Sequence, residues 1–340
     1  MKTVVFLSPK YFPATGGVEK HVAGLSQELL KKGFKVIVLT VQHQLDLPLS
    51  EDIDGVWVER IPFTKIDQKL ATWRWIWSKR DILKKADIIH AHDVFWWYLP
   101  LRFWFFKKPI FTTFHGYEGG ESPRWQAVVH RRVVEKLSKK TLAVGDFIKK
   151  WYGQKSDEVT YGAADGEKPS PSTARKSDQA VFIGRLEWDT GIREYLEVIK
   201  NLGQALKLDI YGEGKLKMSL LELVEDNHWP VKFCGLTKNS IKTFNQAKIA
   251  FAAQYLTILE AMLAKCLVVA IYTSPMKNDY LSFHPAAEFM LIAGSGREAA
   301  GKFLILSERK KEEMIINAYN WAKEQTWEKL AKQYLSLWQL

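Results

Sequence analysis

The chain has 340 residues, of which 47% are hydrophobic, so it can bury the core of one very large domain or of two medium ones. No apolar run reaches about 18 residues without a charge, which excludes the usual pattern of a membrane-spanning helix, and two cysteines, Cys234 and Cys266, exclude a disulfide framework. The net charge is +11, most of it in residues 1–163, where 26 Lys and Arg face 17 Asp and Glu; such a half suits an anionic partner.

The first half alternates predicted strands with predicted helices. A β-rich run over 3–7 precedes a helical periodicity over 18–32, and a strand over 35–41 completes a β-α-β unit. Short apolar runs bounded by turns or charges, typical of buried parallel strands, continue this pattern. The predicted strands of this half are 3–7, 35–41, 55–61, 86–91, 109–114, 141–144 and 159–161. Their order predicts a doubly wound sheet.

The composition changes over 162–179, a stretch rich in Gly, Pro, Ser and charge that we expect to be a linker or long loop. The pattern then restarts, with strands over 180–183, 207–211, 231–234 and 267–271, a helix over 191–200 and a helical last 30 residues. We therefore predict an α/β protein with two Rossmann-like domains, 1–163 and 164–320, that face a cleft, and a final helix over 321–340.

Ligands of parallel sheets bind at the carboxyl ends of the strands, so residues after each strand are the candidates for a site. Gly16 and Gly17 follow the first strand, where backbone without Cβ atoms can approach a phosphate; a flexible loop explains them equally well. His115 ends another strand, where it can contact a ligand, although a surface histidine is the commoner case. The run 90–93 contains two histidines and an aspartate, but we do not expect a metal there.

In the second half, Arg185, Gly212 and Gly214 follow successive predicted strands. A guanidinium at such a place can bind a diphosphate through two hydrogen bonds. Thr257 and Glu260 stand three positions apart where an apolar helix is predicted to begin, which is the spacing of a capping box. The same helix start suits a phosphate, so capping and ligand binding are both open interpretations.

The order of these motifs resembles that of the family 4 retaining glycosyltransferases, which have the GT-B fold, and the resemblance covers nearly the whole chain. The matching motifs are Gly16-Gly17-Val18-Glu19-Lys20-His21, Asp87-Ile88-Ile89-His90-Ala91-His92, Thr113-Phe114-His115-Gly116, Gly184-Arg185-Leu186, Gly212-Glu213-Gly214 and Leu259-Glu260-Ala261-Met262. The resemblance implies a final helix that crosses back to the first domain. It also implies transfer of a sugar, with retention, from a UDP-, GDP- or ADP-sugar to a hydroxyl acceptor.

The resemblance further implies a role for each matched residue. His115 and Arg185 would be the catalytic residues, with His115 beside the transferred sugar and Arg185 on the leaving phosphate. Glu260 would bind the nucleotide ribose. The implied donor-binding residues are Gly16, Gly17, Arg185, Gly212, Gly214 and Glu260. No cofactor and no metal are expected, because cationic side chains and a helix N-terminus stabilise the departing diphosphate.

Two positions depart from the family pattern. Ala252 stands where the family usually has a second glutamate, and Thr190 stands where it usually has a phosphate-binding lysine. Loss of such a cation would cost roughly 2–4 kcal/mol of transition-state stabilisation. Lys215, Lys217 and Lys277 are candidate replacements. Without a replacement, the chain would be a degenerate, non-catalytic protein that binds a ligand or a partner.

Two segments of the first half, 71–80 and 94–108, mix aromatic residues with Lys and Arg. This mixture suits a membrane interface, and a core helix with exposed lysines is the alternative. We expect shallow contact with an anionic membrane surface, a glycan or lipid-linked acceptor, and a cytoplasmic location that includes a peripheral position on the inner face of the membrane. A nucleic-acid binder is less favoured, because the sequence shows no RNP-like or zinc motif. A sugar-nucleotide epimerase would need acidic and histidine residues that we do not locate.

Overall fold

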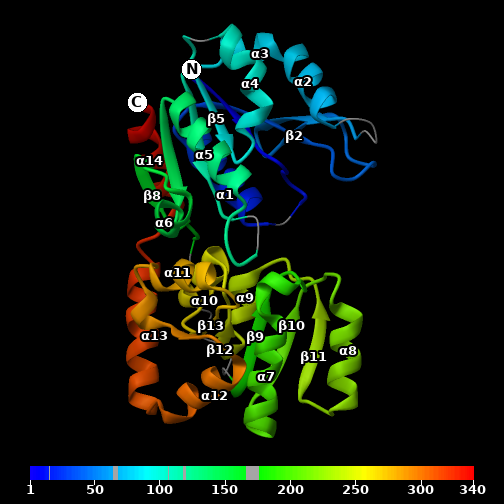
Figure 1. Ribbon diagram of the computed structural model, residues 1–340, viewed down its shortest axis with the longest axis vertical. Helices are drawn as coiled ribbons and strands as arrows, with labels where there is room; N and C mark the ends of the chain where they lie inside the picture. Colours follow the sequence, from blue (N-terminus) through cyan, green and yellow to red (C-terminus); the bar gives the residue numbers. More distant parts are fainter. Residues whose placement is uncertain (15, 64–67, 106, 118–119, 166–175) are drawn as a thin grey trace. The chain divides into compact units, whose positions relative to one another are not determined.

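The computed structural model describes residues 1–14, 16–63, 68–105, 107–117, 120–165 and 176–340. The chain divides into two units, and each is described by itself (Figure 1). Unit 1 comprises Met1–Glu118, Pro123–Thr160 and Trp327–Leu340, and unit 2 comprises Gly119–Ser122 and Tyr161–Thr326. Residues 166–175 of the predicted linker lie outside the described residues, and the strand that follows them begins earlier than expected, at Lys176.

Unit 1 is built on an eight-stranded sheet in the order β3-β4-β2-β1-β5-β6-β7-β8, parallel except for the pair β3 and β4. Its strands are β1 Thr3–Leu7, β2 Lys35–Val41, β3 Ser50–Ile53, β4 Val56–Ile61, β5 Ile88–His92, β6 Ile110–Phe114, β7 Lys140–Val144 and β8 Glu158–Thr160. Its helices are α1 Gly17–Lys31, α2 Gln68–Ser78, α3 Arg80–Lys85, α4 Phe95–Trp104, α5 Trp125–Leu137, α6 Phe147–Tyr152 and α14 Trp327–Trp338. The predicted doubly wound sheet is thus confirmed for this half.

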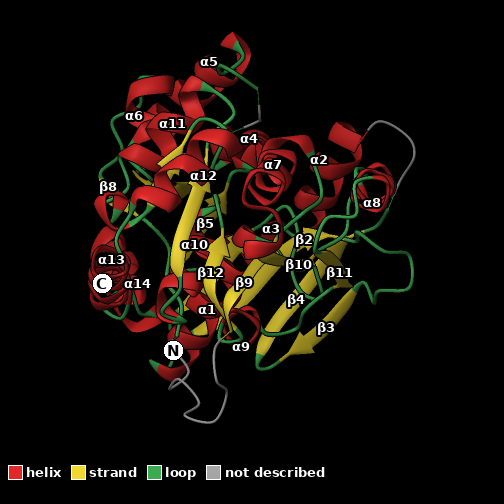
Figure 2. Ribbon diagram, turned by 90° about the horizontal axis from the view of Figure 1, so that it is seen from below, coloured by secondary structure: helices red, strands yellow, loops and turns green. Residues whose placement is uncertain are grey.

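The central strands of unit 1 are apolar along their whole length because helices cover the sheet (Figure 2). In β1 the run 4–7 is completely buried, and β5 and β6 are buried at every position. Burial on both sides removes the alternation of apolar and polar residues that marks a half-exposed strand. The short apolar runs of the sequence are therefore the signature of this sheet.

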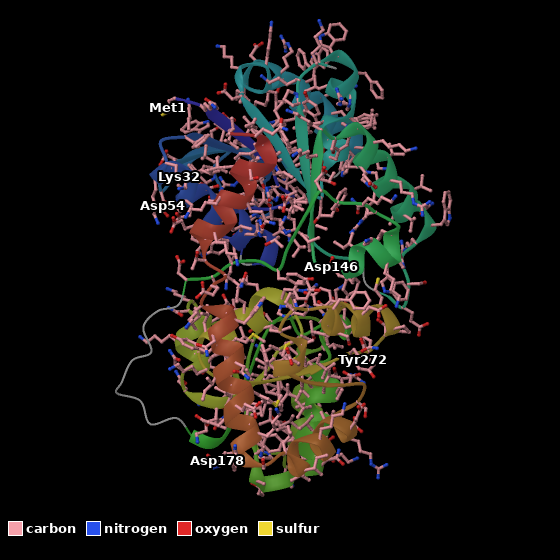
Figure 3. All side chains as sticks on the ribbon, turned by 90° about the vertical axis from the view of Figure 1, so that its left-hand side faces the viewer. Met1, Lys32, Asp54, Asp146, Asp178 and Tyr272 are labelled. Carbon is pink, nitrogen blue, oxygen red and sulfur yellow. The ribbon has the colours of Figure 1, made fainter. Side chains whose placement is uncertain are left out.

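The antiparallel hairpin of β3 and β4 was not predicted from the sequence. Asp54 and Gly55 both have positive φ at its turn, the conformation of a two-residue hairpin loop, and an Asp-Gly pair is its usual sequence signal. The Gly55 N–H donates to Asp52 Oδ1 over 2.9 Å. The turn lies near the end of α1, where Gln27 donates to the Asp54 carbonyl and Lys32 follows (Figure 3). The strand predicted over 55–61 is the second arm of this hairpin.

Unit 2 is built on a six-stranded parallel sheet in the order β11-β10-β9-β12-β13-β14. Its strands are β9 Lys176–Ile183, β10 Lys207–Tyr211, β11 Val231–Gly235, β12 Ala247–Phe251, β13 Leu267–Ile271 and β14 Leu291–Ala293. Its α-helices are α7 Ile192–Leu202, α8 Lys217–Asp226, α9 Ser240–Phe244, α10 Tyr255–Leu263, α11 Pro275–Ser282, α12 Gly296–Ile305 and α13 Glu308–Ala322, and 3₁₀ turns span Trp188–Thr190, Gly203–Ala205 and Ala287–Phe289.

Helix α7 shows how unit 2 forms its core. Ile192, Tyr195, Leu196 and Ile199 recur at the spacing of one helical face, and all four are buried in the main hydrophobic cluster. The Tyr195 ring stacks on Phe251 with 4.7 Å between ring centroids, which joins the helix to β12. Strands β12 and β14 were not predicted, and β12 pairs with both β9 and β13 in the middle of the sheet.

The last 30 residues form two helices that belong to different units. Helix α13 lies in unit 2, whereas α14 lies in unit 1 and packs on α1. The α14 residues that face unit 1 are buried; they are Leu330, Ala331, Tyr334, Leu337 and Trp338. A Cβ atom on Gly24 of α1 would lie 2.5 Å from the Trp327 ring, so glycine is required for this close packing.

Candidate functional site

Unit 1 contains a cavity of about 360 Å³, within the usual range of small-molecule pockets. Its wall is formed by the first turn of α1, by the residues after β5 and β6, and by α4 and α5. The lining residues are Val18, Asp93, Phe95, Phe114, His115, Gly116, Tyr117, His130, Arg131 and Val134. The structure thus places His115 in a cavity wall at the carboxyl ends of two neighbouring strands.

His115 is held on both its backbone and its ring. Its N–H donates to Asp93 Oδ1 over 3.0 Å, and its Nε2 lies 2.8 Å from His92 Nδ1. Asp93 adopts a left-handed backbone with φ of 60°, and its own N–H donates to the Thr113 carbonyl. Burial, with a smaller effect of the Arg131 charge, lowers the pKa of His115 to about 3, so the ring is neutral at pH 7.

Arg131 supports the turn that carries His115. Its Nη2 donates to the Gly116 carbonyl, and its guanidinium lies 3.8 Å from the Tyr152 ring centroid and 5.5 Å from that of Phe114. A cation over two aromatic faces is stabilised by their quadrupoles when it is withdrawn from water. The sequence had not marked this residue, because one arginine among the several basic residues of α5 gives no local signal.

A chain of hydrogen bonds joins α14 to β5, to β6 and to α1. Trp338 Nε1 donates to His90 Nδ1 over 3.0 Å, and since an indole N–H only donates, the proton of neutral His90 lies on Nε2. His90 Nε2 then donates to Thr113 Oγ1, which lies 2.8 Å from the Tyr334 hydroxyl. Tyr334 lies 2.8 Å from His21 Nε2. Each buried donor finds an acceptor if Thr113 donates to Tyr334 and Tyr334 donates to His21.

Three histidines, His21, His92 and His115, bring ring nitrogens within 4.8 Å of one another. Three imidazoles are a common ligand set for zinc. Here, however, two of these rings hydrogen bond each other, and His21 Nε2 is engaged with Tyr334. This arrangement matches paired neutral imidazoles better than lone pairs aimed at one ion. That the protein needs no metal stays a prediction.

Gly16 and Gly17 lie at the first turn of α1 in unit 1. Gly16 is the N-cap residue and Gly17 the first helical residue. A Cβ atom on Gly16 would collide with the Glu19 carboxylate, whereas one on Gly17 would meet nothing within 4 Å. The Glu19 carboxylate is the end of a flexible side chain that can move aside, so packing requires glycine at neither position. The predicted approach of a phosphate to Gly16 and Gly17 stays a prediction.

In unit 2, Arg185 follows β9, and its side chain is 68% exposed and pairs with Asp189 over 2.7 Å. Gly212 and Gly214 follow β10, next in the sheet. A Cβ atom on Gly212 would collide with the Gly184 carbonyl, and one on Gly214 with the backbone of the residue after Arg185. The structure therefore brings Arg185 and both glycines together, and close backbone packing accounts for the glycines.

The predicted capping box at Thr257 and Glu260 is wrong. Helix α10 begins at Tyr255, its N-cap residue is Gln254, and no side chain of the cap residue bonds the helix. The reason is a tertiary contact: the Tyr280 hydroxyl accepts from the Tyr255 N–H over 2.8 Å and takes the place of a local cap. Glu260 consequently lies in the second turn, and it is buried.

The three candidate replacement lysines occupy different places in unit 2. Lys217 pairs with Glu213 over 2.8 Å, and Lys215 is exposed. Lys277, in the first turn of α11, is buried; its Nζ donates to the Ala253 carbonyl and lies 4.1 Å from the Tyr280 ring centroid. This lysine follows β13, two strands along the sheet from Arg185.

Electrostatics also associate Lys277 with the Arg185 group. Burial lowers the pKa of Lys277 to about 7, while Asp189 raises it and Arg185 lowers it. Thr190, at the position of the family lysine, is buried and donates to the Glu187 carbonyl. Of the three candidate replacement lysines, Lys277 is the one whose pKa is affected by Arg185 and Asp189.

No helix of the described chain has both the length and the apolar character needed to cross a bilayer. Comparison with family models matches residues 15–158 to Glycosyltransferase Family 4 and residues 177–283 to Glycosyl transferases group 1. Among curated proteins no match is found.

Solved structures of the same fold cover nearly the whole chain. A sucrose-phosphate synthase from Thermosynechococcus elongatus is similar with 14% identity and a TM-score of 0.79, over 100% of this chain and 98% of that one. A glycosyltransferase from Rickettsia africae has 16% identity and a TM-score of 0.75, over 99% and 98%. HepE from Anabaena, in complex with UDP and glucose, has 15% identity and a TM-score of 0.75, over 99% and 100%. The predicted GT-B fold is thereby confirmed.

Proposed function

The chain belongs to the glycosyltransferases in which a family 4 half precedes a group 1 half, and we propose that it transfers a sugar from a nucleotide sugar to a hydroxyl group of an acceptor. The observation that carries this proposal is the series of groups at one edge of the unit 2 sheet. Arg185, Lys277 and the N-terminus of α10 follow β9, β13 and β12, which are consecutive in the sheet order. Two cations beside a helix N-terminus suit a diphosphate.

In this proposal Arg185 leaves Asp189 to bind the leaving diphosphate, and Lys277 supplies the second positive charge. Glu260 binds the ribose hydroxyls, and Gly212 and Gly214 line the nucleotide pocket. HepE is described with UDP and glucose, which supports a UDP-linked donor first, with GDP- and ADP-sugars to be tested beside it. Transfer would proceed with retention and without a metal or other cofactor, because the side-chain cations offset the developing negative charge.

The acceptor would occupy the unit 1 cavity, with His115 in its wall. Its volume of about 360 Å³ is at the lower end of small-molecule pockets and suits one sugar residue or a similar headgroup. The first turn of α1 contributes Val18 to the same wall. A glycan or lipid-linked acceptor fits this proposal, and the protein would act in the cytoplasm.

The surface formed by α2, α3 and α4, here called the aromatic–basic surface, supports contact with an anionic membrane. Trp104 is 68% exposed and lies edge-on to Trp77 with 5.4 Å between ring centroids, and Phe103 is 71% exposed. The three helices hold six Lys and Arg against one acid, Asp81. They lie together at one end of unit 1 (Figure 1). Amphipathic aromatics among cations suit the headgroup region, and a lipid-linked acceptor would then be within reach.

Calorimetry with UDP, GDP and ADP tests the donor site. We expect at least one of them to bind, and Arg185→Ala to weaken that binding about 10- to 100-fold, the usual effect of losing a charge-assisted hydrogen bond of about 1.5–3 kcal/mol. Lys207→Ala removes an exposed cation whose partner is Asp178 and serves as the matched control. If no nucleoside diphosphate binds, the proposed function is wrong.

Turnover separates the enzyme from its main rival, a degenerate protein that binds without catalysis. Incubation with UDP-, GDP- and ADP-sugars, followed by chromatography of the nucleotide products, detects transfer or slow hydrolysis of the donor. Release of nucleoside diphosphate supports the transferase. Binding without release from any donor, with and without added membranes as acceptor, supports the non-catalytic alternative.

A further inference from the structure

His92 is one of several buried side chains of unit 1 whose hydrogen bonds are incomplete in the described part of the chain. It is completely buried at the end of β5. Its Nδ1 lies 2.8 Å from His115 Nε2, while its own Nε2 has no hydrogen-bond partner within the part of the chain that the structure describes. A pair of imidazoles with one shared hydrogen bond has one proton in that bond. The question is which ring donates it.

The two possible answers differ in what they leave unpaired. If His115 Nε2 donated, His92 Nδ1 would accept, and the proton of neutral His92 would sit on its buried Nε2 with no acceptor. If His92 Nδ1 donates, the unpaired atom is a bare nitrogen lone pair. Unpaired buried N–H groups are rarer in proteins than unpaired acceptors, and a buried donor without a partner costs about 1–3 kcal/mol. The second arrangement is therefore the stable one.

Both rings are neutral near pH 7, so neither imidazole carries a second proton that would change the choice between the two arrangements. Burial lowers the pKa of His92 well below its ordinary value, with the neighbouring His90 adding to the effect. The ring of His115 is neutral for the same reason. With Nε2 accepting from His92, the proton of neutral His115 must lie on Nδ1, its other ring nitrogen.

We propose that His92 is a positioning residue that fixes the proton of His115 on Nδ1, so that His115 offers a hydrogen-bond donor to an oxygen of the ligand in the unit 1 cavity. The identity of that ligand as a sugar rests on the proposed function, whereas the tautomer rests on the hydrogen bonds and on the burial of the two rings. The protonated Nδ1 of such a ring donates a hydrogen bond to a hydroxyl or ether oxygen of the ligand. The ring does not act as a general base, because its one lone pair is already used by His92.

The same arrangement bears on the three-histidine cluster. In the hydrogen-bonded state described above, His21 Nε2 accepts from Tyr334 and His115 Nε2 accepts from His92. Only His92 Nε2 then keeps an unused lone pair among the three rings. One lone pair does not hold a zinc ion, so the proposal and a zinc site exclude each other.

The test is NMR of the full chain with ¹⁵N-labelled histidine at pH 7, using long-range ¹H–¹⁵N spectra that distinguish protonated from bare ring nitrogens. We expect His115 and His92 each to show a protonated Nδ1 and a bare Nε2. His90 is the internal control, because Trp338 fixes the opposite tautomer there. A protonated Nε2 on either His115 or His92 would overturn the proposal, and so would stoichiometric shifts of the cluster on titration with zinc chloride.

A variant pair tests whether His92 is the cause. His92→Phe removes the donor, and we expect the proton of His115 to move to Nε2 in part of the molecules, so that the Nε2 signal is no longer that of a bare nitrogen. His284→Phe makes the same change at a buried histidine of unit 2 and should leave the His115 signals unchanged. An unchanged His115 tautomer in folded His92→Phe would refute the positioning role; if that variant does not fold, the wild-type spectrum still decides.

Activity provides a separate readout. Once a donor is identified, His92→Phe should lower kcat about 10-fold or more, while calorimetric affinity for the nucleoside diphosphate stays within about 2-fold of wild type. Failure of every nucleoside diphosphate to bind the wild type would overturn the proposed function and leave the tautomer result standing. If a nucleoside diphosphate binds but His115 does not show the expected tautomer, the positioning role of His92 is overturned and the proposed function stands.

Discussion

Lys277 gives the sharpest test of the donor site, because its charge depends on pH in the working range. Burial lowers its pKa to about 7, so about half of the molecules carry the charge at pH 7 and about one in a hundred at pH 9. If a diphosphate binds the charged form, its apparent affinity falls in proportion to that fraction. The expected loss between pH 7 and pH 9 is about 50-fold, or about 2 kcal/mol.

The assay is calorimetric titration with UDP at pH 7, 8 and 9. A phosphate group has its second pKa near 6, so the ligand itself changes little over this window. Wild type should lose affinity steadily as the pH rises, and Lys277→Met should bind weakly with a flat profile. Lys217→Met, which removes a lysine paired with Glu213, should keep the wild-type slope. An unchanged slope in Lys277→Met, or a flat wild-type profile, would refute this role.

Stability of the ligand-free protein provides a second measurement. The folded-state pKa of Lys277 lies below its unfolded value of about 10.5, so the unfolded chain binds the extra proton between pH 7 and pH 10.5. Stability from this group is complete above pH 10.5 and is lost as the pH falls to 7. Lys277→Met should therefore stabilise unit 2 at pH 7, by up to about 5 kcal/mol, and the gain should vanish near pH 10.5.

Three further outcomes are expected. Gly24→Ala should lower the stability of unit 1 by about 1–3 kcal/mol in thermal unfolding, because the new Cβ meets the Trp327 ring. As the control, a Cβ on Gly301 of α12 meets nothing within 4 Å, so Gly301→Ala should be neutral or stabilising by up to about 1 kcal/mol. Trp104→Asp should reduce co-sedimentation with vesicles of phosphatidylglycerol and phosphatidylcholine. Trp188→Asp, at an exposed tryptophan of unit 2, should not. Equal losses in the two variants would contradict membrane contact at the aromatic–basic surface. Donor turnover should persist in EDTA, and loss restored by a divalent cation would contradict a metal-independent reaction.

The sequence predicted the elements whose apolar composition is typical of buried strands. The runs over 3–7, 35–41, 207–211 and 267–271 are strands with the same limits as predicted. Strand β12, by contrast, reads Ala-Lys-Ile-Ala-Phe, and its alanines give little strand preference of their own. It forms because β9 and β13 pair with it from both sides. Such pairing depends on contacts distant in sequence, which local patterns do not contain.

The site residues divide in the same way. Strand ends were identifiable, so His115 and Arg185 lie where a ligand of a parallel sheet is expected. The partners that tune these residues were not identifiable. His21 meets Tyr334 across 313 positions, and the cap of α10 comes from Tyr280 on the next helix. Each is a polar contact made by tertiary packing, and single-residue chemistry does not reveal its partner.

Lys277 lies close to one of the two positions that depart from the family pattern. Its ammonium donates to the carbonyl of Ala253, which follows Ala252 in the chain. Burial lowers the pKa of this lysine, and the nearby carboxylate of Asp189 raises it. A bound diphosphate would also raise it, because it is an anion. The pH dependence of UDP binding therefore tests whether Lys277 supplies the charge that Thr190 does not.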